Sequence, residues 1–413
     1  MCFTYAWSLD VLITEAQQHK TSFLVAMTHQ NKHENLVTDK LIKNFEILDT
    51  IQTIKAPGPL KEISYYRRNK IDFLVAITVD EKKLPYCVDI QLISPWGASL
   101  ETERKQWPVM LSKKFEFHTE KDLQQITNQI TDDIINRALC LQGFASYPIA
   151  YVYKKDKTKI VISDITGDLK TNLYECHYPI LGLTWSPDGS KLAFIEVQDN
   201  GPVLKTVDRY KKIIQEHVRD MYVASPLFSN DSQSLYYVAA PYSVGQIFKK
   251  NLVTNNIEML TVGQDWIIDI NEGSDSYNLL VTADRIGTAQ LYEFNILNKR
   301  FKRLTFNEDQ CSKGFLSLKN KALFYTVTTP AQTVLVKRSL TDKSFDSTLV
   351  MSDHYAEGVT MPETQGIAVF EKTAQGQSVI IIKSMNSGLE RVLFDQDGGG
   401  EYSSPSWASQ PGF

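Results

Sequence analysis

A short apolar triplet recurs six times along the last two thirds of this chain. The triplets begin at positions 149, 192, 235, 279, 323 and 367, so that successive triplets lie 43 or 44 residues apart. Ile149-Ala150-Tyr151 and Leu192-Ala193-Phe194 are two of them. A period of about 40 to 45 residues built from short apolar runs is typical of a β-propeller blade, which has four antiparallel strands. The repeats therefore predict six blades.

The best-preserved repeat contains a tight turn between two strands. It reads Trp-Ser-Pro-Asp-Gly at 185–189, where proline fixes φ and glycine tolerates a positive φ, so the motif predicts a turn and not a catalytic sequence. Its first half returns at 404–409. The three strands missing from that last blade are predicted at 149–153, 159–164 and 172–176. The last blade is thus expected to take strands from both ends of the propeller sequence. The C-terminal strand then closes the ring, which leaves no open sheet edge.

These motifs carry a resemblance to a known family. The Trp-Ser-Pro-Asp-Gly repeat, the α/β segment before the propeller and Pro-Ser-Trp-Ala at 405–408 together resemble the TolB family of periplasmic propeller proteins in the Gram-negative Tol-Pal system. The resemblance covers essentially the whole chain. It weakens in the later blades, since the second has only Phe-Ser-Asn-Asp-Ser at 228–232.

The composition is that of an ordinary globular protein. Of the 413 residues, 43% are hydrophobic and 22% are charged, and the longest uncharged apolar runs are far shorter than the roughly 20 residues that span a bilayer. A net charge of −4 does not indicate the basic surface by which proteins bind nucleic acid. The basic cluster of Arg209, Lys211 and Lys212 is interpreted as a solvated outer strand.

Four segments are expected. Residues 1–8 are interpreted as the remnant of a signal peptide, because Ala6 and Ser8 fit the small-residue positions of a cleavage site, although no basic or long apolar segment precedes them. The alternative is that Met1 is a true cytoplasmic start. Residues 9–142 are predicted to form an N-terminal α/β domain, 143–148 a hinge, and 149–413 the six-bladed propeller.

Alternating strand and helix patterns define the N-terminal domain. Strands are predicted at 11–13, 22–27, 71–79, 87–93 and 110–117, and helices at 34–44, 60–67 and 120–141. The last helix places Leu123, Ile126, Ile130, Ile134 and Leu141 on one face, which is expected to cover the sheet.

No motif for catalysis, cofactor or metal binding stands out. The sequence contains no G-x-S-x-G nucleophile elbow and no glycine-rich phosphate loop. His29 and His33 could share a metal, but a site needs three or more ligands, so a pair of surface histidines is favoured. The five cysteines lack C-x-x-C spacing and are expected to be mostly buried thiols. We therefore expect no catalytic residues, no cofactor and no metal.

The resemblance implies a periplasmic adaptor, not an enzyme. TolB-like proteins bind the peptidoglycan-associated lipoprotein Pal through the channel face of the propeller, and they bind TolA through the first residues of the mature chain. They support outer-membrane integrity and cell division, with only peripheral contact with the envelope. A monomer is expected.

The resemblance and the blade repeat together give candidate binding residues. Alignment with the family's Pal contacts gives Tyr222 and Ser225, and the repeat extends the same face to Tyr178, Trp266, Gln310, His354 and Tyr402. The TolA segment would be Leu9, Asp10, Val11, Leu12 and Ile13, whose partly alternating apolar and polar residues suit strand addition to a sheet edge. The alternative is a propeller enzyme or a carbohydrate- or small-ligand-binding protein that uses the central channel, although no pair of carboxylates indicates one.

Overall fold

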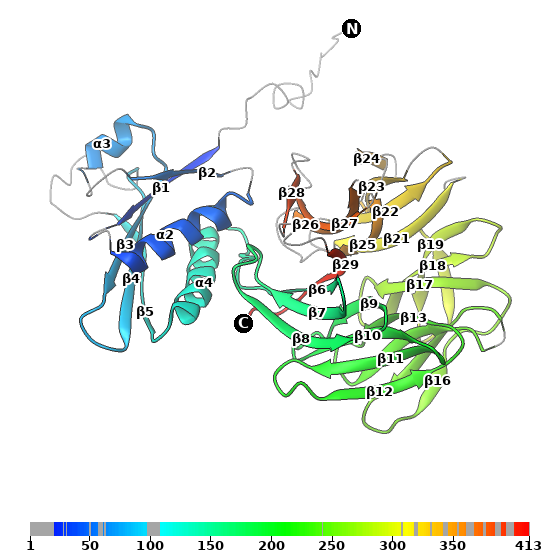
Figure 1. Cartoon of the computed structure of the whole chain (residues 1–413). Coiled ribbons are helices and arrows are strands. Elements are labelled where there is room, and N and C mark those ends of the chain that lie inside the picture. The colour runs from blue at the N-terminus through cyan, green and yellow to red at the C-terminus, as the bar shows by residue number, and fades with distance from the viewer. Residues whose placement is uncertain are drawn as a thin grey trace, which may run out of the picture. The chain divides into compact units, whose positions relative to one another are not determined.

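The computed structural model describes residues 20–27, 29, 31–48, 51–56, 61, 63–96, 108–241, 243–306, 309–317, 321–330, 333–341, 346–352, 355–360, 367–374, 377–384, 390–393 and 400–412. The chain divides into two compact units, Met1–Leu141 and Gln142–Phe413. Figure 1 shows an α/β unit followed by a unit of successive β-sheets.

A five-stranded mixed sheet forms the centre of the first unit. Its strands are β1 (Thr21–Met27), β2 (Ile51–Lys55), β3 (Phe73–Asp80), β4 (Tyr86–Ile93) and β5 (Val109–Phe117), and its helices are α2 (Lys32–Phe45), α3 (Ile63–Arg68) and α4 (Glu120–Leu139). The strand order is β2-β1-β3-β4-β5. β1 pairs in parallel with β2 and β3, whereas β3–β4 and β4–β5 are antiparallel. The predicted α/β domain is confirmed.

Local sequence explains where the two longer helices begin and end. Asn31 caps α2 by accepting the N–H of Glu34, and Thr119 forms a capping box with Asp122 at the start of α4. α4 ends at Cys140, which adopts a left-handed conformation. The buried face of α4 contains Leu123, Ile130 and Ile134 together with buried threonines at 127 and 131, whereas the predicted Ile126 and Leu141 are only half-buried. β2 was not predicted, and the strand expected at 11–13 lies outside the described residues.

Four-stranded antiparallel sheets follow one another in the second unit. The first holds β9 (Ile180–Trp185), β10 (Lys191–Gln198), β11 (Gly201–Asp208) and β12 (Ile214–Arg219), and the second holds β13 (Val223–Phe228), β14 (Ser234–Ala239), β15 (Gln246–Asn251) and β16 (Ile257–Met259). The third holds β17 (Trp266–Glu272), β18 (Asn278–Asp284), β19 (Ala289–Asn295) and β20 (Arg300–Arg303). The fourth holds β21 (Gln310–Ser317), β22 (Ala322–Thr328), β23 (Thr333–Ser339) and β24 (Asp346–Ser352), and the fifth holds β25 (Tyr355–Thr360), β26 (Ile367–Ala374), β27 (Gln377–Ser384) and β28 (Glu390–Val392).

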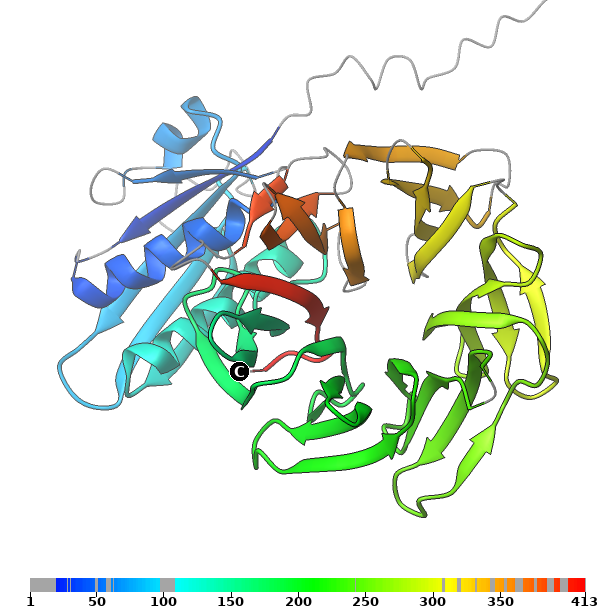
Figure 2. The same ribbon diagram turned by 45° about the vertical axis from the view of Figure 1, so that its right-hand side comes forward.

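One further sheet joins distant parts of the chain. β29 (Glu401–Trp407) pairs antiparallel with β6 (Ile149–Lys154), which continues to β7 (Thr158–Ser163) and β8 (Lys170–Cys176). Trp407 lies opposite Ile149 in this pairing. The first strands of neighbouring sheets lie side by side in the order β9, β13, β17, β21, β25, β29, and β29 also contacts β9. Figure 2 shows these sheets around a common centre.

Aromatic and aliphatic residues fill the space between sheets. In the second strands, Phe194, Tyr237 and Tyr325 are each at most 2% exposed. One core cluster combines Val152 and Ile160 of the β29-β6-β7-β8 sheet with Trp185 and Phe194 of the next sheet. Burial of such large side chains stabilises the contact between neighbouring sheets.

Two expectations about side chains need correction. Arg209 is not part of a solvated strand: it lies in the β11–β12 turn, its guanidinium is 5.5 Å from the Trp185 ring, and it donates to the carbonyl of Gly412 at 2.6 Å. The prediction of mostly buried cysteines is wrong for the described part of the chain. There only Cys311 is buried, whereas Cys140 is exposed and the thiols of Cys87 and Cys176 are half-buried.

Within the described residues, no helix is long and apolar enough to cross a membrane.

Candidate functional site

Four of the predicted binding residues lie where a first strand begins. Tyr178 precedes β9, Tyr222 precedes β13, Trp266 is the first residue of β17, and Gln310 is the first residue of β21. Because the strands of each sheet alternate in direction, the connectors into the first strands and the turns between second and third strands share one end of the sheets. Arg285, in the β18–β19 turn, accordingly pairs with Asp265 of the β16–β17 connector at 2.8 Å. We call this end the connector face.

The four side chains differ in how far they reach water. Trp266 is 43% exposed, and Gln310 is also exposed. Tyr222 is half-buried against the core cluster that contains Leu227 and Tyr236. Tyr178 is half-buried and donates its hydroxyl to Asp199 at 3.2 Å, and this hydrogen bond raises the pKa of the Tyr178 phenol. Trp266 and Gln310 are thus the most accessible of the four.

The remaining predicted residues are placed differently. Tyr402 is only 5% exposed and packs against the rings of Tyr151 and Tyr153, with centroid separations of 5.7 and 5.1 Å. Its side chain is therefore part of the core beside the connector face. His354 and the predicted TolA segment at 9–13 lie outside the described residues.

Every first strand carries a β-bulge at an equivalent position. In β13, Ala224 and Leu227 pair with Val238 and Tyr236, so β13 has one residue more than its partner at this point. The same one-residue excess occurs in β9, β17, β21 and β29, and β25 has two residues more than β26 at its register shift. Positive φ angles mark four of the bulges, at Gly182 (60°), Ser225 (49°), Lys313 (50°) and Ser404 (48°). Bulges redirect side chains, and left-handed non-glycine residues persist only where the surrounding structure holds them.

The bulges connect three neighbouring first strands through polar side chains. Ser225 on β13 donates its hydroxyl to Asp269 on β17, and the other carboxylate oxygen of Asp269 lies 3.8 Å from Nζ of Lys313 on β21. Asn271 of β17 donates to the carbonyl of Gly314 on β21 at 3.2 Å. The Asp269 side chain is 17% exposed and that of Lys313 is 34% exposed. We call Ser225, Asp269 and Lys313 the inner-strand network, of which sequence reasoning had identified only Ser225.

One bulge position needs glycine for space as well as for conformation. A Cβ on Gly182 would lie 3.0 Å from Cδ of Pro226 on the neighbouring first strand. Together with its φ of 60°, this close approach means that a side chain at 182 would strain both β9 and β13.

Two buried glutamines hold the residue directly before a first strand, and sequence reasoning missed them. Gln290 accepts from the hydroxyl of Thr305 at 2.8 Å and donates to the carbonyl of Asp309 at 2.9 Å, directly before Gln310. Gln246 lies 44 positions earlier and donates to the carbonyls of Gly263 and Asp265, directly before Trp266. The shared 44-residue offset of Gln246/Gln290 and of Thr261/Thr305 is the sequence signal that could have identified them.

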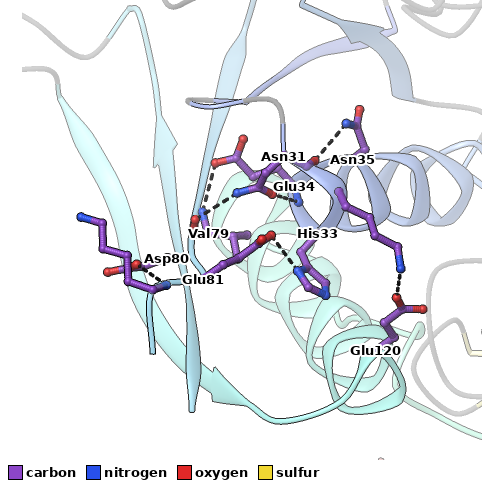
Figure 3. A network of polar contacts seen from close by, with 10 residues as sticks. Asn31, His33, Glu34, Asn35, Val79, Asp80, Glu81 and Glu120 are labelled. Carbon is purple, nitrogen blue, oxygen red and sulfur yellow. Dashed lines mark hydrogen bonds and ion pairs between the residues drawn. The ribbon is translucent and has the colours of Figure 1, made fainter. Parts of the chain in front are cut away.

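The N-terminal end of α2 holds a polar network in the first unit (Figure 3). The carboxylate of Glu34 is fully buried and accepts the backbone N–H groups of Val79, at 3.1 Å, and His29, at 2.9 Å. His33 lies 2.7 Å from a carboxylate oxygen of Glu81, and Lys32 pairs with Glu120. This ion pair lowers the pKa of the Glu120 carboxyl. The network joins α2 to the end of β3 and to α4.

The histidine pair is not part of a metal cluster in the described structure. His33 uses Nδ1 for Glu81, and no group of three or more histidine, cysteine, aspartate or glutamate side chains in the described part of the chain could hold a metal ion. Asp164 and Asp168 close the β7–β8 turn, where both carboxylates accept from the Thr166 hydroxyl at 3.1 and 2.9 Å. These acids therefore stabilise a turn.

Comparison with proteins of known sequence and structure identifies relatives of this chain. The TolB protein of the Tol-Pal system from Bordetella pertussis is 33% identical over 87 residues, which are 21% of this chain and 20% of that protein. The corresponding protein of Coxiella burnetii is 26% identical over 145 residues, 33% of this chain and 31% of that protein. The chain thus aligns with only a fifth to a third of the length of these curated relatives.

Similarity in structure extends much further than similarity in sequence. The crystal structure of TolB from Acinetobacter baumannii matches with a TM-score of 0.80 at 18% identity, covering 94% of this chain and 96% of that one. This confirms the predicted combination of an N-terminal α/β domain with a β-propeller. The sequence profile described as the TolB β-propeller domain matches residues 139–410, well over half of the chain. The chain therefore belongs to the TolB β-propeller family.

Proposed function

We propose that this protein is a periplasmic, non-enzymatic adaptor of the Tol-Pal system. On this proposal it binds a Pal-like peptidoglycan-associated lipoprotein through the connector face and TolA through residues 9–13, and it supports outer-membrane integrity and cell division. The names of the curated relatives, which are Tol-Pal system proteins, support the proposal. The observation that carries it is the convergence of Tyr178, Tyr222, Trp266 and Gln310 at one end of four successive sheets.

A closed ring would give the connector face a fixed shape. We propose that the sheets are six blades and that β29 is the closing strand. Two observations support this proposal: β29 pairs with β6, and β29 also lies beside β9, so the first strands contact one another in cyclic order. A ring without free edges would hold the six connectors in constant relative positions.

The composition of the connector face suits protein binding. Protein interfaces concentrate their energy in a few aromatic and arginine residues, and Trp266 at 43% exposure is such a residue. Tyr222 and Tyr178 are half-buried, so they would offer edges of fixed rings to a partner. Gln246 and Gln290 hold the backbone directly before Trp266 and Gln310, which reduces the cost of ordering these residues on binding. Tyr402 would contribute by packing below this surface.

The N-terminal segment is proposed as a second, separable partner site. Deletion of residues 9–12 should abolish TolA binding and leave the binding of the Pal-like protein largely intact. Export is tested by N-terminal sequencing of protein from the periplasm, which should begin at or near Leu9. Equal loss of both partners on deletion, or a chain that retains Met1 in the periplasm, would contradict this part of the proposal.

One experiment separates the adaptor from a propeller that binds a small ligand. Tagged protein is captured from an envelope extract, and the co-purified molecules are identified by mass spectrometry. The proposal predicts a lipoprotein with a peptidoglycan-binding domain, and predicts its loss in a Tyr222→Ala/Trp266→Ala double variant. A sugar or other small molecule recovered without a protein partner would favour an enzyme or a carbohydrate-binding protein.

A further inference from the structure

A buried carboxylate lies at the boundary between the first sheet of the second unit and the sheet formed by β29, β6, β7 and β8. Glu196, on β10, is 2% exposed. Its Oε2 accepts the hydroxyl of Tyr174 on β8, and its Oε1 accepts the side-chain amide of Gln198 and lies 3.0 Å from Nζ of Lys205 on β11. Burial raises the pKa of the Glu196 carboxyl, but these hydrogen bonds and the charge of Lys205 outweigh burial and lower the pKa on balance. The carboxylate is therefore charged at neutral pH.

The contacts of Glu196 close into a ring across three strands of the first sheet. Lys205 also lies 3.3 Å from Glu216 on β12, Glu216 lies 3.6 Å from Nη2 of Arg219, and Arg219 donates to Oε1 of Gln198 at 2.8 Å. Each of these five side chains thus contacts two others in the ring. A carboxylate is costly to bury unless it is paired and hydrogen-bonded, and this carboxylate has three donors. The ring therefore holds the Glu196 side chain in one position.

The connector before β9 is held from two sides. From β10 and the turn that follows it, the N–H of Val197 donates to the carbonyl of Pro179 at 2.9 Å, and Asp199 accepts the Tyr178 hydroxyl at 3.2 Å. From the end of β8, the thiol of Cys176 donates to the carbonyl of Tyr178 at 3.2 Å. The backbone and the ring of Tyr178, a predicted binding residue, thus depend on how β8 and β10 lie relative to each other.

The hydrogen bond between Tyr174 and Glu196 joins these two supports directly. Tyr174 lies two residues before Cys176 on β8, and Glu196 directly precedes Val197 on β10. The bond is formed between side chains of two different sheets. Tyr174 and Glu196 therefore fix the ends of the two strands between which the connector runs.

The first sheet differs here from the two sheets that follow it. Glu196 lies four positions after the start of its apolar triplet, and alanine occupies the equivalent positions 239 and 283. Those alanines pair with the two glutamines that hold the next connectors. In the sheet before the β9 connector, the position of these glutamines is taken by Lys159, whose Nζ lies 3.4 Å from Glu175 on β8. The connector before β9 is thus supported from the following sheet, where Glu196 lies.

We infer that Glu196 is a positioning residue of the binding surface, which fixes the connector before β9 and thereby the ring of Tyr178 for the protein partner. The carboxylate is itself buried, so it acts through Tyr178 and not by touching the partner. A side chain that is already ordered loses less conformational freedom on binding, which favours affinity. This inference rests on the proposed function and adds a buried residue to the same site.

Calorimetric titration with the soluble domain of the Pal-like protein tests the inference through a double-variant cycle. Tyr178→Ala should weaken binding about tenfold, as expected for an interface residue. Glu196→Gln keeps the shape of the side chain but removes its charge, and it should weaken binding about fivefold. In the Tyr178→Ala background, Glu196→Gln should have no further effect, because the ring through which it acts is gone. A loss of stability alone would not produce this dependence on Tyr178.

Two further variants make the cycle specific. Tyr174→Phe removes only the hydroxyl that joins the two sheets and leaves Glu196 paired with Lys205, so it should fold and should weaken binding in the same Tyr178-dependent way. Glu175→Gln is the matched control. It removes a more exposed carboxylate from the neighbouring position of β8, where Glu175 pairs with lysines, and it should bind as the wild type does.

Hydrogen exchange gives a readout that does not need the partner. The Val197 amide should exchange faster in Glu196→Gln and Tyr174→Phe than in the wild type, because the connector carbonyl that accepts it is held less firmly. The Ile267 amide, which donates to the carbonyl of Gly245 at 3.0 Å, is the internal control and should be unchanged.

The outcomes separate this inference from the function on which it rests. Wild-type affinity in Glu196→Gln and Tyr174→Phe, with weakened binding in Tyr178→Ala, would overturn the positioning role and leave the proposed function intact. Equal weakening by Glu196→Gln with and without the Tyr178 ring would also overturn it, since the carboxylate would then act by another route. No binding by the wild type would overturn the proposed function and the positioning role together.

Discussion

The indole N–H of Trp185 donates to the backbone carbonyl of Ser406 at 3.1 Å, joining two residues that are 221 positions apart. Trp185 ends β9, and Ser406 lies in β29 of the neighbouring sheet. Ser409 continues the contact by donating its hydroxyl to the carbonyl of Pro187 at 3.2 Å. The Trp-Ser-Pro-Asp-Gly turn therefore holds the C-terminal strand as well as reversing the chain.

Loss of this single hydrogen bond should be measurable. Trp185→Phe keeps an aromatic ring in the core but leaves the buried carbonyl of Ser406 without the indole donor, which should lower the free energy of unfolding by about 1 to 3 kcal/mol. Guanidinium denaturation measures the change. Trp266→Phe is the matched control, because Trp266 is 43% exposed. Equal effects of the two substitutions would contradict the role of the Trp185–Ser406 bond.

Removal of Trp407 should be more damaging. Trp407 is 7% exposed, pairs with Ile149 in β6 and donates its indole N–H to the carbonyl of Tyr147 at 3.1 Å. Trp407→Ala should lower the free energy of unfolding by about 3 to 5 kcal/mol, because it leaves a cavity in the core. Truncation after Gly400 should be worse, since it removes all of β29. A truncated protein with wild-type solubility and melting temperature would contradict the proposal that β29 closes the ring.

Stability should fall at acidic pH because of His217. Its Nε2 lies 2.7 Å from the Thr206 hydroxyl, and burial, followed by the charge of nearby Lys250, lowers its pKa from 6.5 to about 4. The unfolded chain takes up a proton below about pH 6.5, whereas the folded chain does so only near pH 4. The contribution of His217 to the free energy of unfolding is thus fully present above pH 6.5 and is lost as the pH falls toward 4. Its size is at most about 3 kcal/mol, and less where water reaches the half-buried ring.

Substitution identifies the histidine responsible. His217→Gln keeps a hydrogen-bonding group near Thr206 but cannot take up a proton, so the unfolding free energy should vary less between pH 6.5 and 4 than in the wild type. His177→Gln is the control, because His177 is exposed. If the pH dependence of the unfolding free energy weakened equally in both variants, or did not weaken in His217→Gln, other groups would be its cause.

The buried carboxylate of Glu34 should stabilise the first unit. Glu34→Ala leaves the backbone N–H groups of His29 and Val79 without their acceptor, and it should lower the free energy of unfolding by about 1 to 3 kcal/mol. Hydrogen exchange of the Val79 amide measures the effect locally. Lys32→Ala is the control: its contact with Glu120 is an exposed ion pair and should contribute little. Unchanged exchange in Glu34→Ala would contradict the assigned role.

The sequence predicted strand positions well where the repeat was strong. The 43- to 44-residue spacing identified the second strands of successive sheets, because these strands are buried on both sides and read as continuous apolar runs, as β14 and β22 do. β2 was missed, since Ile51–Lys55 alternates too briefly to stand out. Arg209 was misassigned because the residues that surround it, Trp185 and Gly412, are distant in sequence.

The candidate site was only partly predictable. The repeat gave the starts of the first strands, and with them Tyr178, Trp266 and Gln310, whereas Tyr222 came from the family resemblance. The partners of Ser225 were not predictable, because a bulge adds a residue to the strand and redirects the side chains that follow.

Titration of the purified soluble domain of the Pal-like protein into wild-type, Tyr222→Ala and Trp266→Ala proteins tests the central proposal most directly. If the connector face is the binding surface, each substitution should weaken binding by about 2 kcal/mol or more, roughly thirtyfold. The melting temperature should remain unchanged for Trp266→Ala, because Trp266 is 43% exposed. Unchanged affinity in both variants, with wild-type folding, would show that the partner binds another surface or that this chain has a different partner.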